Sequence, residues 1–180
     1  MLREWQQGST PALSLHVGVR ADIDVFMGIE RSAFAQDRIS RAEYDELAES
    51  KDAAMLLARF HGSAIGAMVL KRQHEVEGSV AYLYSLAVVP GFRKIGIGRA
   101  LLSRAIALSK TWNVQRLCLE VRPDNHAALD LYGSAGFVTT GTREDWYSDG
   151  APAICMVRDF AADLAGPPFN NTVQPMMVNL

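Results

Sequence analysis

The sequence has little cysteine and no excess of positive charge. Its two cysteines, Cys118 and Cys155, stand in apolar, strand-like runs and share no metal-ligand spacing with the four histidines. Buried, reduced thiols are therefore expected, and no metal site. With 18 Lys and Arg against 20 Asp and Glu, the formal charge is −2. No global positive field attracts such a protein to nucleic acid or anionic lipid, so we expect neither as a partner.

The sequence also lacks a long hydrophobic run. No apolar stretch approaches the roughly 18 residues that span a membrane, and the start, MLREWQQGSTPAL, has no signal-peptide core. We therefore expect a cytoplasmic protein. The 180 residues, 49% of them hydrophobic, suffice for one well-packed domain. We expect it at 12–160, between an N-terminal extension at 1–11 and a loosely held C-terminal tail at 161–180.

Hydrophobic periodicity predicts alternating strands and helices without internal repeats. A polar turn is expected at 73–78. The predicted order is a strand at 13–19, helices at 22–34 and from a capping box at 40–43, strands at 54–60, 64–70 and 79–89, a helix at 99–110, a strand at 115–121, a short helix from 124, and strands at 137–142 and 153–160. This pattern predicts one α/β domain, either mixed α+β or three-layered.

A glycine-rich loop joins a predicted strand to a predicted helix at the centre of the chain. The run VVPGFRKIGIGRALL, residues 88–102, contains three glycines and the adjacent cations Arg93 and Lys94. Proteins hold phosphates at such junctions, because glycines let backbone N–H groups approach and a helix begins there. A pyrophosphate site is the functional interpretation, and a surface turn with incidental basic residues is the structural alternative.

Two nucleotide-binding motifs do not fit this loop. A P-loop requires Lys-Ser/Thr after its last glycine, which is absent here. A dinucleotide fingerprint begins well at Gly96 and Gly98, but Leu101 occupies the place of the third glycine, and close helix–strand packing is lost.

Two separated motifs resemble one family. LYSLAVVPGFRKIGIGRALL resembles the acyl-CoA-binding motif of the GNAT superfamily of N-acetyltransferases, and CLEVRPDNHAALDLYGSAGF resembles the next strand and helix of its ribosomal-protein alanine N-acetyltransferase (RimI-like) branch. The resemblance covers about 13–160. It implies a strongly twisted, mostly antiparallel mixed sheet of about seven strands, flanked by helices and splayed between strands 4 and 5. It also implies acetyl transfer from acetyl-CoA directly to a primary amine, without metal.

The resemblance also implies a set of cosubstrate-binding residues. Backbone amides of Leu86 and Val88 would bind the thioester carbonyl and the pantetheine, while the side chains there are core. Asn125 would contact the pantetheine, and as a helix cap it also has a structural interpretation. The full set is Leu86, Ala87, Val88, Arg93, Lys94, Ile95, Gly96, Ile97, Gly98, Arg99, Asn125 and Tyr132.

Glu120 and Tyr132 are the candidate catalytic residues. Glu120, in RLCLEVR, is a carboxylate among residues expected to be buried, where its pKa would rise toward that of a useful general base. A structural salt bridge with Arg122 or another cation is the alternative. The resemblance assigns Tyr132 as the general acid for the coenzyme A thiolate, a role that suits a phenol protonated at neutral pH. A buried core tyrosine is the other interpretation.

The acceptor is less defined by the sequence. Trp146 and Tyr147, in REDWYSDG, match in type an aromatic pair that binds a peptide N-terminus in the RimI-like branch. A protein or peptide N-terminus is therefore the favoured acceptor, and a small-molecule amine stays open. A non-catalytic acyl-CoA-binding module is the second function class. The protein is expected to be a monomer or a homodimer.

Overall fold

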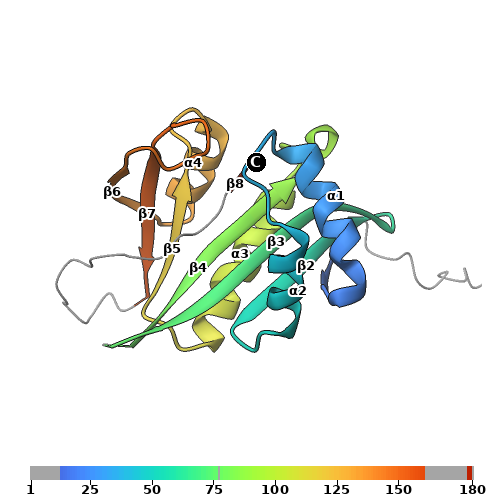
Figure 1. The fold of residues 1–180 in the computed structure, drawn as a ribbon, viewed down its shortest axis with the longest axis horizontal. Helices are drawn as coiled ribbons and strands as arrows, with labels where there is room; N and C mark the ends of the chain where they lie inside the picture. The colour runs from blue at the N-terminus through green and yellow to red at the C-terminus, as the bar shows by residue number, and fades with distance from the viewer. Residues whose placement is uncertain (1–12, 77, 161–177, 180) are drawn as a thin grey trace, which may run out of the picture.

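One twisted sheet runs through the structure, a computed structural model that describes residues 13–76, 78–160 and 178–179 (Figure 1). Seven strands follow the order β1-β2-β3-β4-β5-β7-β6, and β8 lies beside β4. Their bounds are β1 (Leu13–Val17), β2 (Ala53–Phe60), β3 (Ser63–Glu75), β4 (Gly78–Val88), β5 (Arg116–Val121), β6 (Val138–Arg143), β7 (Ala153–Asp159) and β8 (Val178–Asn179). Neighbours are antiparallel except β4–β5 and β4–β8. The predicted mixed sheet is confirmed.

Helices cover both faces of this sheet. They are α1 (Ile23–Ala33), α2 (Arg41–Glu49), α3 (Ile97–Thr111) and α4 (His126–Ser134), with short 3₁₀ turns at Arg20–Asp22 and Pro90–Phe92. Helices α1 and α2 pack on one face of β2–β4, and α3 packs on the other (Figure 1). The predicted capping box of α2 is present, since Ser40 Oγ accepts from the Glu43 N–H and the Glu43 carboxylate accepts from the Ser40 N–H. The three-layer prediction is therefore confirmed.

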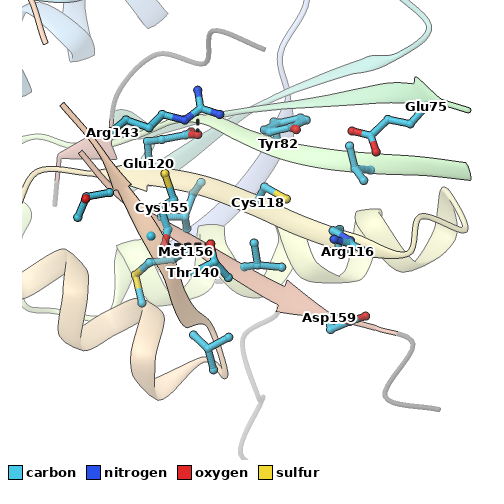
Figure 2. Close-up of a pocket in the computed structure, with 16 residues that line it drawn as sticks. Glu75, Tyr82, Arg116, Cys118, Glu120, Thr140, Arg143, Cys155, Met156 and Asp159 are labelled. Carbon is cyan, nitrogen blue, oxygen red and sulfur yellow. Dashed lines mark hydrogen bonds and ion pairs between the residues drawn. The ribbon is translucent and has the colours of Figure 1, made fainter. Parts of the chain in front are cut away.

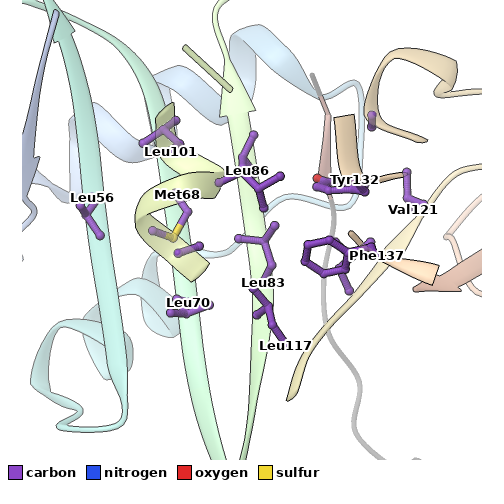
Figure 3. Packing of buried hydrophobic residues seen from close by; sticks show 14 of the residues in the cluster. Leu56, Met68, Leu70, Leu83, Leu86, Leu101, Leu117, Val121, Tyr132 and Phe137 are labelled. Carbon is purple, nitrogen blue, oxygen red and sulfur yellow. The ribbon is translucent and has the colours of Figure 1, made fainter. Parts of the chain in front are cut away.

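Alternation along β4 divides the core between the two faces. Leu86 and Val88 belong to the cluster under α3 and α4, which also contains Tyr132 and Phe137 (Figure 3). Ala87 belongs to the cluster under α1 and α2. Successive side chains of a strand point to opposite faces, so the predicted core role of all three side chains is confirmed.

A buried carboxylate ties α1 to β4. Glu30 accepts from Ser85 Oγ at 2.7 Å and from the Ile39 N–H at 2.9 Å. Burial raises the pKa of Glu30, and these hydrogen bonds oppose the rise. The contacts hold the end of the α1–α2 connection, at Ile39, and α1 itself next to β4.

Most element boundaries differ from the sequence prediction by one or two residues, and the end of β3 differs by more. The polar turn predicted at 73–78 is wrong, because β3 continues to Glu75 and pairs with β4 as far as Gly78. Cross-strand pairing, which polar composition does not reveal, extends the hairpin. The first strand ends at Val17, because the Gly18 N–H bonds to Met55 and a 3₁₀ turn begins two residues later.

The predicted extension at 1–11 and the tail at 161–180, apart from β8, lie outside the described residues. Among the helices that the structure describes, none is both long and apolar enough to cross a bilayer.

Candidate functional site

Strands β4 and β5 pair over a short stretch and then diverge. The parallel register joins Val80–Tyr82 to Arg116–Cys118, whereas β4 continues to Val88 and β5 to Val121. The edge of β4 beyond Tyr82 is therefore open toward β5. This opening corresponds to the splay predicted between strands 4 and 5.

The hydrogen-bond pattern of β4 shows which amides reach the open edge. The Val89 N–H donates to the Ile65 carbonyl of β3 at 2.9 Å. Because N–H groups alternate along a strand, those of Leu86 and Val88 point to the opposite, open edge. Strand β8 pairs with β4 there, at Leu86 and Ala87. Leu86 and Val88 thus present backbone donors where the sequence analysis expects them.

A hollow of about 650 Å³ lies between the glycine loop and α4. Six of the predicted residues line it, together with four residues of α4 that the sequence analysis missed. The lining is Val88, Arg93, Lys94, Gly96, Gly98, Arg99, Ala127, Asp130, Leu131 and Ser134. The α4 residues recur at helical spacing on one face, a signal that could have identified them. Ile95 is exposed and Ile97 is buried in the core, so neither lines the hollow.

The loop conformation requires glycine at the start of α3. Gly96 caps α3 in the left-handed region with φ of 93°, and Lys94 also has a positive φ of 64°. Arg93 Nε donates to the Val88 carbonyl at 3.2 Å and its Nη2 to Ala33 at 3.4 Å, so this side chain also fastens the loop to β4 and α1. Lys94 and Arg99 are exposed at the rim of the hollow. The helix N-terminus and these cations suit a polyanion.

Glu120 lies on β5, with 4% of its surface exposed. Burial raises the pKa of its carboxyl from 4.5 to about 7, and Arg143 partly opposes the rise. Arg143 Nη1 lies 3.8 Å from Glu120 Oε1, while Glu120 Oε2 is buried without a hydrogen-bond partner. Arg122 instead pairs with Asp149 at 2.9 Å. The alternative of a salt bridge is therefore wrong for Arg122, but its second form, a salt bridge with another cation, is present as the contact with Arg143.

Tyr132 lies on α4, completely buried. Its ring contacts Phe137 with centroids 5.6 Å apart (Figure 3). Its hydroxyl is buried without a partner, and desolvation raises its pKa well above the ordinary value. Tyr132 is thus both a core residue and a protonated, unpartnered hydroxyl. Asn125 accepts from the Ala128 N–H at 3.2 Å and caps α4, as its structural interpretation predicts.

The predicted aromatic pair is held by arginines at the β6–β7 connection. Arg143 stacks over Trp146 at 4.6 Å, and Arg122 stacks over Tyr147 at 4.8 Å. Tyr147 is buried, its hydroxyl has no partner, and burial raises its pKa.

Tyr147 interacts electrostatically with several titratable groups around the site. The charges of Glu120 and Asp37 act on its phenol, and Tyr147 in turn acts on Tyr132. Asp37 accepts from the Ser148 N–H at 3.1 Å and joins the α1–α2 connection to this loop, a contact that the sequence analysis missed. Buried hydroxyls and a carboxylate with unsatisfied hydrogen-bonding capacity therefore gather near Tyr147.

A second hollow, of about 410 Å³, extends from Glu120 and Arg143 along β5, β6 and β7 (Figure 2). Cys118 and Cys155 line it as free thiols whose pKa values burial raises. Within the described part of the chain, no three His, Cys, Asp or Glu side chains gather as a metal site.

Comparisons with known proteins agree with this geometry. A family model described as the acetyltransferase (GNAT) family matches residues 24–137. A Bacillus subtilis protein named as a candidate [ribosomal protein bS18]-alanine N-acetyltransferase is 32% identical over 136 residues, covering 75% of this chain and 87% of that protein. The crystal structure of the Escherichia coli ribosomal-protein-S18-alanine N-acetyltransferase is 26% identical, with a TM-score of 0.72, and covers 88% of this chain and 99% of that chain.

A third comparison bears on the fold. Arabidopsis thaliana Naa50, solved with the bisubstrate analogue CoA-Ac-MVNAL, is 21% identical with a TM-score of 0.74, covering 83% of this chain and 99% of that chain.

The buried Glu120 predicts a pH-dependent stability. Its pKa is higher in the folded chain, about 7, than the ordinary 4.5, so its contribution is fully present below pH 4.5 and is lost as pH rises through 7. Between pH 4 and pH 8, Glu120→Gln should gain about 3 kcal/mol in free energy of unfolding relative to wild type, at about 1.4 kcal/mol per pH unit. Urea denaturation measures this, with the exposed Glu144→Gln as control. A constant difference would contradict the burial of an ionisable Glu120.

Proposed function

The chain belongs to the acetyltransferase (GNAT) family, and from that membership we propose that it acetylates the α-amino group of a protein or peptide N-terminus, with acetyl-CoA as donor. The observation that carries the proposal is Glu120, a buried carboxyl whose pKa lies about 7 and whose Oε2 has no partner. A non-catalytic module has no use for such a group. Its relatives are named N-acetyltransferases, and the chain is therefore an enzyme of this class.

The glycine-loop hollow supports acetyl-CoA as cosubstrate. The pyrophosphate would lie at the N-terminus of α3, against backbone N–H groups and the exposed Lys94 and Arg99. The pantetheine arm would then reach the amides of Leu86 and Val88 at the open edge of β4. Because β8 pairs with the same edge, the cosubstrate would replace β8 there.

The reaction needs a neutral amine, a polarised carbonyl and a proton for the departing thiolate. Glu120 takes the proton of the ammonium, directly or through a water, and its raised pKa suits a base at neutral pH. The amine nitrogen then bonds to the thioester carbon, whose oxygen accepts from a β4 amide. The carbon–sulfur bond breaks, and Tyr132 donates its proton to the thiolate. The nitrogen gives up its second proton as the amide forms, and that proton restores the Tyr132 phenol, while Glu120 releases the first proton to solvent. Tyr132 suits this step because its elevated pKa keeps it protonated.

An α-amino group is the acceptor that such a base serves best. Its pKa is about 7.7–8.0, close to that of Glu120, whereas a lysine amine near 10.4 costs roughly 3–4 kcal/mol more to deprotonate at neutral pH. The face of Trp146 and Tyr147, joined to the α1–α2 connection through Asp37, would hold the first residues of the acceptor.

We also propose a cytoplasmic location. Cys118 and Cys155 are both free thiols, and reduced cysteines are typical of proteins in that compartment.

Competing peptides test the function directly. Two peptides of one sequence, each with a lysine and either a free or a blocked N-terminus, would be incubated with enzyme and acetyl-CoA, and thiol release and the acetylated position measured. We expect acetylation of the free α-amine and at least about tenfold slower turnover of the blocked peptide. Equal acetylation of lysine in both peptides would refute the α-amine proposal.

Lys94 and Arg99 should contribute to acetyl-CoA affinity. Each exposed cation is expected to add about 0.2–1 kcal/mol, as solvent-exposed ion pairs do, so Lys94→Ala or Arg99→Ala should weaken binding up to about fivefold. The loss should shrink at high salt. Calorimetry would measure it, with Arg104→Ala as control, since Arg104 is exposed on α3 and outside the hollow. If Lys94→Ala and Arg99→Ala bound acetyl-CoA as tightly as Arg104→Ala, the pyrophosphate would have to bind away from Lys94 and Arg99.

Tyr132→Phe separates the general acid from the core residue. The substitution keeps the ring against Phe137 and removes only the hydroxyl, so folding and acetyl-CoA affinity should survive. Turnover should fall about 10²- to 10⁴-fold, with the acceptor KM little changed. Steady-state kinetics of the folded variant would measure kcat and KM. A kcat near that of wild type would show that Tyr132 only packs in the core.

A further inference from the structure

We propose that Arg143 is a positioning residue that controls the charge of Glu120 and so sets the lowest pH at which the enzyme works. The inference rests on the proposed role of Glu120 as the base. It adds a residue that the motifs of the sequence do not mark, on β6, two strands from β5.

Strand pairing and an aromatic contact hold Arg143 next to Glu120. Arg143 is the last residue of β6, paired in register with Ala153 of β7. Its Nη1 lies 3.8 Å from Glu120 Oε1 (Figure 2). Its guanidinium also stacks over Trp146 at 4.6 Å. The side chains of Arg143 and Glu120 are only 19% and 3% exposed. Water therefore screens this pair little.

Arg143 is the cation that acts on Glu120. Three neighbours are weak acids that are neutral at pH 7: burial raises the pKa of the Cys118 and Cys155 thiols and of the Tyr147 phenol. Arg122 forms salt bridges with Asp149 and Asp124 instead. The titratable side chains that line the hollow with Glu120 include Cys118 on β5, Tyr82 on β4, Cys155 on β7 and Arg143 on β6. The charge of Glu120 also acts on Tyr147 in the β6–β7 connection, and Arg122 directly follows β5.

Two opposing effects therefore meet at one carboxyl. Burial favours the neutral acid, and the neighbouring cation favours the carboxylate. A guanidinium at 3.8 Å stabilises the carboxylate without the close, bidentate pairing that would hold it ionised at all pH values and weaken it as a base. Without Arg143, burial alone would keep Glu120 protonated well into the neutral range, where it could not accept a proton.

The pH profile of kcat/KM tests the inference. Arg143→Met keeps much of the apolar stem and removes the charge, so it should move the acidic limb upward by about one pH unit or more. Arg143→Lys should restore at least half of the shift. Arg122→Met is the matched control, because Arg122 stacks on Tyr147 at 4.8 Å as Arg143 stacks on Trp146, yet its charge pairs with Asp149. The acidic limb of the Arg122→Met profile should stay at the same pH as in wild type, even if the maximum value of kcat/KM changes.

A second readout separates this inference from the proposed function. Carboxyl carbon-13 NMR of the intact enzyme, with the Glu120 signal assigned by its loss in Glu120→Gln, would give the titration midpoint of Glu120 without catalysis. We expect the midpoint and the acidic limb to move together in Arg143→Met. A moved midpoint with an unmoved limb supports the role of Arg143 but overturns Glu120 as the base. An unmoved midpoint in folded Arg143→Met protein, with acetyl-CoA affinity retained, overturns the inference.

Discussion

The divergence of β4 from β5 is the constraint on which the rest of the site depends. Three paired residues on each strand hold them together, and beyond these β4 keeps backbone donors free of β5. The glycine loop lies between the end of β4 and α3, and β5 is the next strand of the sheet (Figure 1). Glu120 is on β5. A closed sheet would bury the Leu86 and Val88 amides in a ladder. Where β5 diverges, β8 pairs with this edge at Leu86 and Ala87, and a long donor that replaces β8 would pass between the strands and meet an amine from the side of the Tyr147 loop.

Burial then gives the carboxyl and the phenol complementary protonation states. Desolvation raises the pKa values of both Glu120 and Tyr132, bringing the carboxyl to about 7 and keeping the phenol protonated. One can therefore accept a proton near neutrality while the other still holds one to donate. Arg143 acts on the carboxyl, whereas burial and Tyr147 set the pKa of the Tyr132 phenol, so the base can be tuned independently of the acid.

Local patterns in the sequence predicted much of this arrangement. The glycine loop, the capping box of α2, the core side chains at the end of β4 and the buried setting of Glu120 each depend on residues close in sequence, and the structure contains all four. The errors and omissions depend on contacts between distant segments. Pairing with β4 extends β3 to Glu75. Arg143 on β6, and not Arg122, lies beside Glu120. Asp37 accepts a hydrogen bond from Ser148, 111 positions away in the sequence. The roles of the site residues stay predictions.

Amide NMR of β4 tests directly whether acetyl-CoA enters the opening between β4 and β5. With the backbone of the full chain assigned, acetyl-CoA would be titrated and the signals of Leu86 and Val88 compared with that of Ala87, whose N–H points to β3. We expect large, saturable shifts at Leu86 and Val88 and small ones at Ala87. Saturable binding that leaves the Leu86 and Val88 amides unperturbed would contradict it, because the donor would then lie outside the opening between β4 and β5.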